Sequence, residues 1–175
     1  MLGHDGLIQI YTGNGKGKTT AALGLVLRAC GHGAKIAVIQ FMKGWEHYGE
    51  LSAVKLLPNV TLVQTGRPDY VYRGKEEQQD FEEAKRGLAL ASEFVSSGEY
   101  DLLILDEINV ALDYKLIPLC DVLTLLDSNP NSLEIVLTGR SAPKELTEKA
   151  DLVTEMKEIK HPYQKGLQGR RGIEY

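Results

Sequence analysis

The 175-residue chain has few cysteines, few aromatic residues and no long apolar run. Its two cysteines, Cys30 and Cys120, lie far apart and without the spacing of a metal site, so we expect reduced, buried thiols rather than a disulfide. No apolar run approaches the roughly 18 residues of a membrane span, and the start, MLGHDG, has no apolar signal core. We therefore expect a cytoplasmic protein without a membrane segment.

The chain also lacks an excess of positive charge. Its net charge is −4 and its pI is near 5.6, whereas proteins that bind nucleic acid broadly present a basic face. We expect no nucleic-acid partner, although a local basic pocket is compatible with this charge. The hydrophobic content of 43% and the length suffice for the core of a single domain, which we expect to span residues 1–175.

Short β-rich runs alternate with helical patterns along the chain. The runs begin at Leu7, Lys35, Val60, Asp101, Leu133 and Asp151. Between them the spacing predicts helices over 19–30, 75–97, 117–126 and 143–150. Several runs are continuously apolar, which is typical of strands covered on both faces. The alternation predicts an α/β fold with a mostly parallel sheet, helices on both faces, and ligands at the carboxyl ends of the strands.

The predicted helix over 75–97 carries apolar residues at helical spacing and ends before Gly98. Its expected buried positions are Phe81, Ala84, Leu88, Ala91 and Val95. The least regular stretches are 42–49, 66–74 and the tail from about residue 161.

A glycine-rich segment, YTGNGKGKTTAAL (Tyr11 to Leu23), lies between the first predicted strand and the first predicted helix. The phosphate-binding P-loop pattern is G-x-x-x-x-G-K-[ST], and Gly17, Lys18 and Thr19 match its end. Thr12 stands where the pattern has its first glycine. A chance glycine-lysine turn is the alternative, but the flanking strand and helix favour a P-loop.

The chemistry of a P-loop is present despite that departure. Glycines let backbone amides turn inward around an anion, and the helix that follows directs its positive dipole end at the same place. Lys18 would contact phosphate oxygens, the Thr19 hydroxyl would bind Mg²⁺ (or Mn²⁺), and Lys16 adds a second cation. The glycines concerned are Gly13, Gly15 and Gly17.

An acidic pair, Asp106 and Glu107, ends the apolar run LLILDE. Such a pair either binds the metal of a nucleotide or caps the following helix near Asn109. With a P-loop present we favour metal binding, and periodicity leaves open which carboxylate touches the metal. Arg140 follows another predicted strand, where it either faces the phosphates or lies on the surface.

Taken together, these segments resemble the ATP:corrinoid adenosyltransferases, the P-loop type of cob(I)yrinic acid a,c-diamide adenosyltransferase. The resemblance covers nearly the whole chain, and its later segments are far more specific than the P-loop alone. The segments are TGNGKGKTTAA, QFMKG (Gln40 to Gly44), LDEINVALDY (Leu105 to Tyr114), VLTGR (Val136 to Arg140), KHPYQKG (Lys160 to Gly166) and GIEY (Gly172 to Tyr175).

The resemblance implies a P-loop NTPase-like (RecA-like) fold, usually in a homodimer. It implies transfer of the 5′-deoxyadenosyl group of ATP to a Co(I) corrinoid with release of inorganic triphosphate, and a reductase or flavoprotein as the electron donor. Without it, a P-loop ATPase or small-molecule kinase would be the first interpretation, because hydrolytic P-loop ATPases show the same acidic pair.

The resemblance also assigns residues. It places the ATP γ-phosphate deep in the loop and selects Glu107, with Thr19, for the metal. Arg28 and Arg140 match arginines near the nucleotide, although spacing alone describes Arg28 as an exposed or ion-paired residue. The nucleotide-binding loop residues are Asn14, Gly15, Lys16, Gly17, Lys18, Thr19 and Thr20.

Aromatic residues beside the corrinoid help to displace its lower ligand in that family. They align loosely with Tyr70 and Tyr72, for which ordinary loop tyrosines are the alternative. Trp45 either meets a flat apolar ligand or is partly buried in the structure. The basic tail residues Lys165, Arg170 and Arg171 either contact phosphate or the rim of the corrinoid, or belong to a solvated, flexible end.

Overall fold

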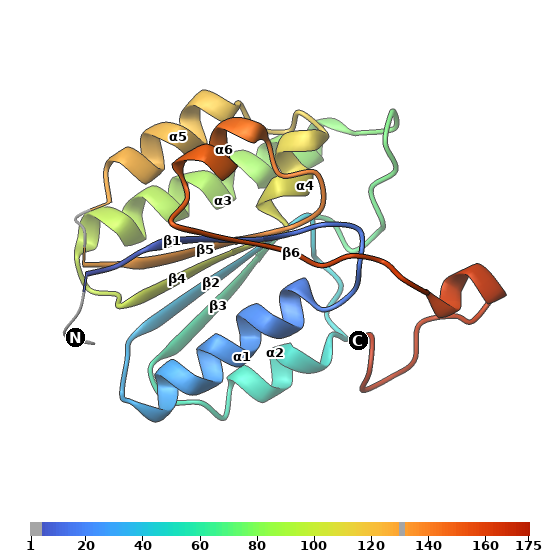
Figure 1. The fold of residues 1–175 in the computed structure, drawn as a ribbon, viewed down its shortest axis with the longest axis horizontal. Coiled ribbons are helices and arrows are strands. Elements are labelled where there is room, and N and C mark those ends of the chain that lie inside the picture. The colour runs from blue at the N-terminus through green and yellow to red at the C-terminus, as the bar shows by residue number, and fades with distance from the viewer. Residues whose placement is uncertain (1–4, 130–131) are drawn as a thin grey trace.

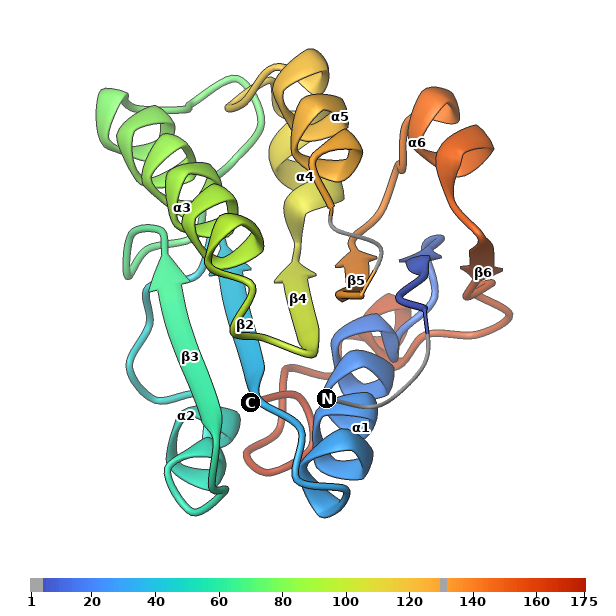
Figure 2. The same ribbon diagram turned by 90° about the vertical axis from the view of Figure 1, so that its left-hand side faces the viewer.

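The computed structural model describes residues 5–129 and 132–175. Six strands form one sheet in the order β3-β2-β4-β5-β1-β6, and every pairing is parallel (Figures 1 and 2). All six predicted strands are present, and the α/β prediction is confirmed. The strands are β1 (Ile8–Thr12), β2 (Ile36–Phe41), β3 (Val60–Thr65), β4 (Leu102–Asp106), β5 (Glu134–Thr138) and β6 (Leu152–Glu155).

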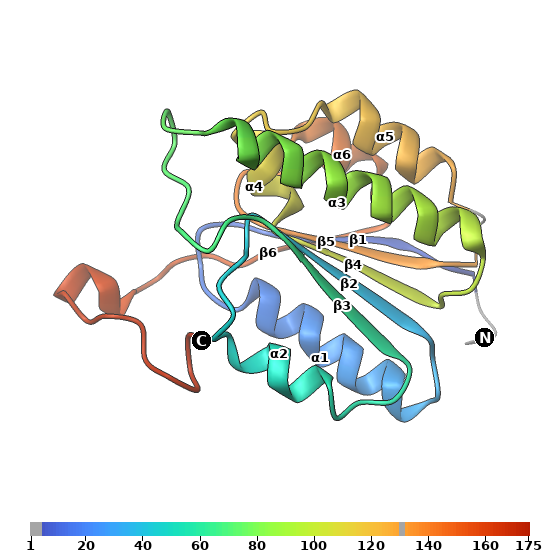
Figure 3. The ribbon, with the colours of Figure 1, turned by 180° about the vertical axis from the view of Figure 1, so that it is seen from behind.

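Helices cover both faces of the sheet, as the alternation predicts. One face carries α1 (Lys18–Gly31) and α2 (Gly49–Val54). The other carries four helices, and Figures 1 and 3 show the two layers from opposite sides. The four are α3 (Gln78–Ser97), α4 (Ile108–Asp113), α5 (Leu119–Asp127) and α6 (Lys144–Lys149).

The central strands build two cores back to back. β2, β4 and β5 are buried along their whole length, which explains their continuous apolar runs. Leu103 and Ile135 face the layer of α3 to α6, and Ile104 and Val136 face α1. The edge strand β6 is exposed along its length and ends at Glu155, earlier than the predicted run.

The structure corrects several local predictions. The short helices α2 and α4 were not among the predicted helices. Helix α3 begins at Gln78, and Phe81, predicted to be buried, is 40% exposed. Ala84, Ala91 and Val95 are buried as predicted, and Asp80 and Gly87 complete the buried face. A Cβ on Gly87 would lie 2.7 Å from the Phe41 ring, so glycine is what lets α3 approach the sheet closely.

The cysteines and the tail need a further correction. Both thiols are free, as predicted, but Cys120 is exposed and Cys30 only partly buried, so the expectation of buried thiols was wrong. The tail forms one 3-10 turn, η1 (Pro162–Lys165), and returns so that Tyr175 lies beside Gly49 at the start of α2 (Figure 1). No helix in residues 5–129 and 132–175 is long and apolar enough to cross a membrane.

Candidate active site

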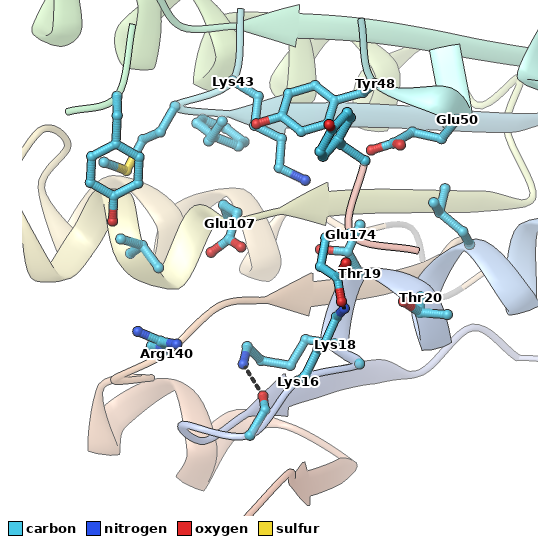
Figure 4. A pocket seen from close by; sticks show the side chains of 18 of the residues that line it. Lys16, Lys18, Thr19, Thr20, Lys43, Tyr48, Glu50, Glu107, Arg140 and Glu174 are labelled. Atoms are coloured by element: carbon cyan, nitrogen blue, oxygen red, sulfur yellow. Dashed lines mark hydrogen bonds and ion pairs between the residues drawn. The ribbon is translucent and has the colours of Figure 1, made fainter. Parts of the chain in front are cut away.

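A cavity of about 780 Å³ opens at the carboxyl ends of the strands. All strands are parallel, so the loops that follow them meet at this one edge. The cavity is lined by the glycine loop, by the segments after β2, β4 and β5, and by the last four residues of the chain (Figure 4). β5 lies between β1 and β4, so Arg140 emerges between the glycine loop and the acidic pair.

Two of the three glycines of the loop adopt backbone conformations that favour glycine. Gly13 (φ 93°) and Gly17 (φ 112°) occupy left-handed backbone regions that other residues rarely adopt. A Cβ on Gly13 or on Gly15 would lie 2.6 Å from the carbonyl oxygen of Met156, so the loop packs directly on the start of the tail. The Gly15 amide donates a hydrogen bond to that oxygen at 2.6 Å, and α1 begins at Lys18.

The two loop lysines have different environments. Lys18 is 8% exposed, and its Nζ donates hydrogen bonds to the carbonyl oxygens of Gly13 (2.8 Å) and Gly15 (2.7 Å). Burial lowers the pKa of Lys18, and the nearby Glu107 carboxylate opposes that shift. Lys16 is exposed, and its Nζ lies 2.5 Å from Glu174 Oε1. The glycine loop therefore forms an ion pair with a carboxylate from the end of the chain.

Asp106 lies at the centre of a buried hydrogen-bond network and is 1% exposed. Its Oδ1 accepts hydrogen bonds from the hydroxyls of Thr19 (2.8 Å) and Thr138 (2.7 Å). Its Oδ2 accepts from Lys43 Nζ (2.8 Å) and from Gln40 Nε2 (3.3 Å). The register of β2 and β4 sets Gln40 directly opposite Asp106. The carboxylate is therefore saturated by donors from four different elements or loops.

Glu107, one residue later, is arranged in the opposite way. Its φ of 62° is left-handed, and its amide donates to Thr138 Oγ1 at 2.9 Å, which turns the side chain toward the cavity. Its carboxylate accepts no hydrogen bond from any described residue. Burial and the adjacent Asp106 charge raise the pKa of Glu107. It makes no side-chain cap on α4, so the capping alternative has no support in the structure.

The other predicted site residues divide into two groups. Thr20, Arg140 and Tyr70 line the cavity, and Tyr70 is 72% exposed. Tyr72 does not line it, but its ring centroid lies 5.0 Å from that of Tyr70. Outside the lining are also Asn14, at the outer turn of the loop, and Arg28, in the last turn of α1.

Several cavity residues had no role in the sequence prediction. Lys43 and Tyr48 follow β2, and Glu174 and Tyr175 belong to the returning terminus. QFMKG and GIEY were recognised as family segments, and this was the signal that could have pointed to Lys43 and Glu174. Trp45 is partly buried against the rings of His47, Tyr48 and Tyr175, which matches its structural alternative.

Sequence comparison identifies the family. The pattern of the ATP:corrinoid adenosyltransferase BtuR/CobO/CobP family matches residues 4–175. The chain belongs to this family and is a transferase. Corrinoid adenosyltransferases from Pseudomonas aeruginosa and Sinorhizobium sp are 33% and 37% identical to it, each over 97% of this chain and over 84% and 80% of the relative. The corrinoid adenosyltransferase of Escherichia coli K12 is 32% identical over 97% of this chain and 86% of its own length.

The fold has relatives outside the adenosyltransferase family. The crystal structure of the RadB recombinase superposes with a TM-score of 0.54 at 14% sequence identity, covering 91% of this chain and 78% of the recombinase. At this identity the likeness supports the fold alone, which is the P-loop NTPase-like architecture expected from the sequence.

The donor set of this adenosyltransferase fits a nucleotide-bound Mg²⁺ rather than a metal held by protein alone. Within residues 5–129 and 132–175, no group of three or more His, Cys, Asp or Glu side chains could hold a metal ion. Mg²⁺ prefers oxygen ligands and is commonly held by one or two carboxylates together with substrate phosphates and water. The Glu107 carboxylate and the Thr19 hydroxyl, which both line the cavity, are oxygen donors of the kind that such an ion prefers.

Proposed function

We propose that the protein transfers the 5′-deoxyadenosyl group of ATP to the cobalt of a Co(I) corrinoid and releases inorganic triphosphate, in adenosylcobalamin biosynthesis or salvage. The observation that carries the proposal is the composition of the cavity at the carboxyl ends of the strands. Its phosphate-binding end contains Lys18, Thr19 and Glu107, and it extends to a second wall of Val110 and Tyr114. Triphosphate and a flat apolar ligand can therefore face each other across one space.

The proposed reaction is a displacement at C5′ of the ribose. Co(I) supplies the electron pair of the new cobalt–carbon bond, and the C5′–O5′ bond breaks with its electrons leaving on triphosphate. The protein therefore needs no base or nucleophile of its own, and its task is to stabilise the negative charge of the leaving group.

Cations from separate elements serve that task. We propose that Lys18 and Arg140 contact the departing oxygens, with the loop amides around Gly17. When bound, Mg²⁺ (or Mn²⁺) supplies further neutralisation of phosphate charge, held by Thr19 and Glu107. A single well-placed donor of this kind is worth about 3 to 4 kcal/mol in the transition state. Only contacts that strengthen as charge develops accelerate the reaction.

The corrinoid end of the site is proposed from the tyrosines. Tyr70 lies at the cavity and Tyr72 packs against Tyr70, which supports the proposal that this pair contacts the corrin and helps to displace its lower ligand. We further propose a homodimer and a reductase or flavoprotein that supplies electrons, and both rest on the family resemblance. We propose a cytoplasmic location from the sequence, in which no apolar run approaches the length of a membrane span.

A P-loop ATPase or small-molecule kinase is the second candidate. The observation that favours it is Glu107 directly after the strand-terminal Asp106, since a carboxylate here can also orient a water molecule. In that reaction the β,γ-phosphate bond breaks, whereas in adenosyl transfer it stays intact.

One experiment separates the two. The protein is incubated with Mg²⁺, chemically reduced Co(I) cobalamin, and either ATP or an analogue with a non-cleavable β,γ bridge. We expect a light-sensitive adenosyl product from both nucleotides and intact triphosphate from ATP. Release of ADP and phosphate without a corrinoid requirement, and no product from the analogue, would refute adenosyl transfer.

A further inference from the structure

The two neighbouring acids at the end of β4 have opposite surroundings, and Lys43 is the charged residue that makes the difference. We propose that Lys43 is a positioning residue: it withholds Asp106 from the metal of the nucleotide and leaves Glu107 as the carboxylate that binds it. This inference rests on the nucleotide-and-metal part of the proposed function and is independent of the corrinoid.

The Asp106 carboxylate has no free acceptor position for a metal ion. An ionised carboxylate offers about four acceptor positions. Asp106 uses two on Oδ1, for Thr19 and Thr138, and two on Oδ2, for Lys43 and Gln40. No position is left for a direct bond to a cation. The contact from Gln40, at 3.3 Å, is the longest of the four, so Lys43 is the principal partner of Oδ2.

The positive charge of Lys43 also opposes a metal ion at Asp106. Lys43 Nζ forms an ion pair with Asp106 Oδ2, and their side chains are 15% and 1% exposed. A metal ion approaching Asp106 would have to displace this ammonium or lie next to it. Like charges in so buried a place repel strongly, because little water screens them. Glu107 has no ion pair with a described residue and lines the cavity, so a cation reaches it without displacing a partner.

Close packing and a cation–π contact hold Lys43 in this position. The segment after β2 packs tightly on the segment after β3: a Cβ on Gly66 would lie 2.4 Å from the Lys43 amide nitrogen. A Cβ on Gly44 would lie 2.2 Å from the Gly66 carbonyl oxygen. The ammonium also lies 5.4 Å from the centre of the Tyr48 ring, a cation–π contact. Figure 4 shows Lys43 extending into the cavity from the side opposite Lys18 and Arg140.

Removing the lysine should therefore have an unusual effect. In Lys43→Met, an acceptor position on Asp106 becomes free and a competing positive charge disappears. Both changes favour a metal at Asp106. They should rescue metal binding in a protein that has lost Glu107, an outcome that a purely structural role for Lys43 would not produce.

The test measures Mn²⁺ binding in the presence of inorganic triphosphate, by electron paramagnetic resonance and titration calorimetry. We expect Glu107→Gln to weaken Mn²⁺ binding by about tenfold or more. The double variant Lys43→Met/Glu107→Gln should recover at least about threefold of that loss. If the double variant binds Mn²⁺ no more tightly than Glu107→Gln, the inference is wrong.

Two control variants test whether a change in folding or in net charge could explain the recovered Mn²⁺ binding. Lys35 precedes β2 as Lys43 follows it, and it forms an ion pair with Glu99 far from the cavity. Lys35→Met/Glu107→Gln should show no recovery. Lys43→Arg/Glu107→Gln keeps a cation beside Asp106 and should remain as weak as Glu107→Gln. Recovery in either variant, or a wild-type protein that binds no Mn²⁺ with triphosphate, overturns the inference. Mn²⁺ binding without adenosyl product would instead refute the proposed function alone.

Discussion

Thr138 offers a sharp test of the site architecture, because one buried hydroxyl bridges both acids. Thr138 is 0% exposed; its Oγ1 donates to Asp106 Oδ1 at 2.7 Å and accepts from the Glu107 amide at 2.9 Å. Thr138→Val keeps the shape of the side chain and removes both hydrogen bonds. Asp106 then lacks one of its two donors on Oδ1, and the Glu107 amide lacks its acceptor.

The expected cost follows from those two losses. A hydrogen bond to a charged group contributes about 1.5 to 3 kcal/mol, and a buried amide left without an acceptor costs about 1 to 3 kcal/mol. We expect Thr138→Val to lower the free energy of unfolding by about 2.5 to 6 kcal/mol. We also expect it to reduce adenosyl transfer, since the left-handed turn that aims Glu107 at the cavity loses its tether.

Urea denaturation measures the stability loss as a shift of the midpoint at unchanged slope. Thr138→Ser retains the hydroxyl and should keep most of the activity. Thr124→Val removes an exposed helix hydroxyl and should change stability by less than about 0.5 kcal/mol. A loss below about 1 kcal/mol in Thr138→Val, with full activity, would refute the bridge.

Three further predictions concern the glycine loop and the terminus. Lys18→Ala should abolish the adenosyl product. The circular dichroism spectrum should stay native, because the side chain forms hydrogen bonds only with loop carbonyls. Unchanged activity in this variant would show that Lys18 has no role in the reaction. Glu174→Gln should tighten triphosphate binding about two- to fivefold in calorimetry, because the Glu174 carboxylate competes for Lys16, whereas weaker binding would mean that Glu174 assists the nucleotide. Hydrogen bonds from Arg170 and Lys16 lower the Glu174 pKa from 4.5 to about 2, so its stabilising contribution is complete above pH about 4.5 and is lost as the pH falls toward 2. Glu174→Gln should flatten that part of the pH–stability profile, and an identical profile in the variant would contradict the assignment.

Much of the fold could be predicted because its signals are local. The apolar runs of β2, β4 and β5 are continuous because both faces of these strands are covered. The glycine loop could be predicted because Gly13 and Gly17 adopt left-handed conformations that favour glycine, so the glycines themselves mark the turn. Helices α2 and α4 have six residues each and show a helical period only weakly, so they escaped prediction. Helix α6 is equally short, but it lies within the predicted helix over 143–150. Spacing identified the buried side of α3 through Ala84, Ala91 and Val95, but it also included Phe81, which lies in the first turn of the helix and is 40% exposed.

The sequence by itself determined the alternation of strands and helices along the chain, the glycine loop and the presence of two acids at the end of β4. The tertiary structure alone decided what those acids touch. Lys43, Asp106 and Thr138 are far apart in the chain, and they meet because parallel strands bring their carboxyl ends to one edge of the sheet. Glu174 reaches Lys16 because the tail returns to the glycine loop. Contacts between residues so distant depend on packing, which no local pattern of residues encodes.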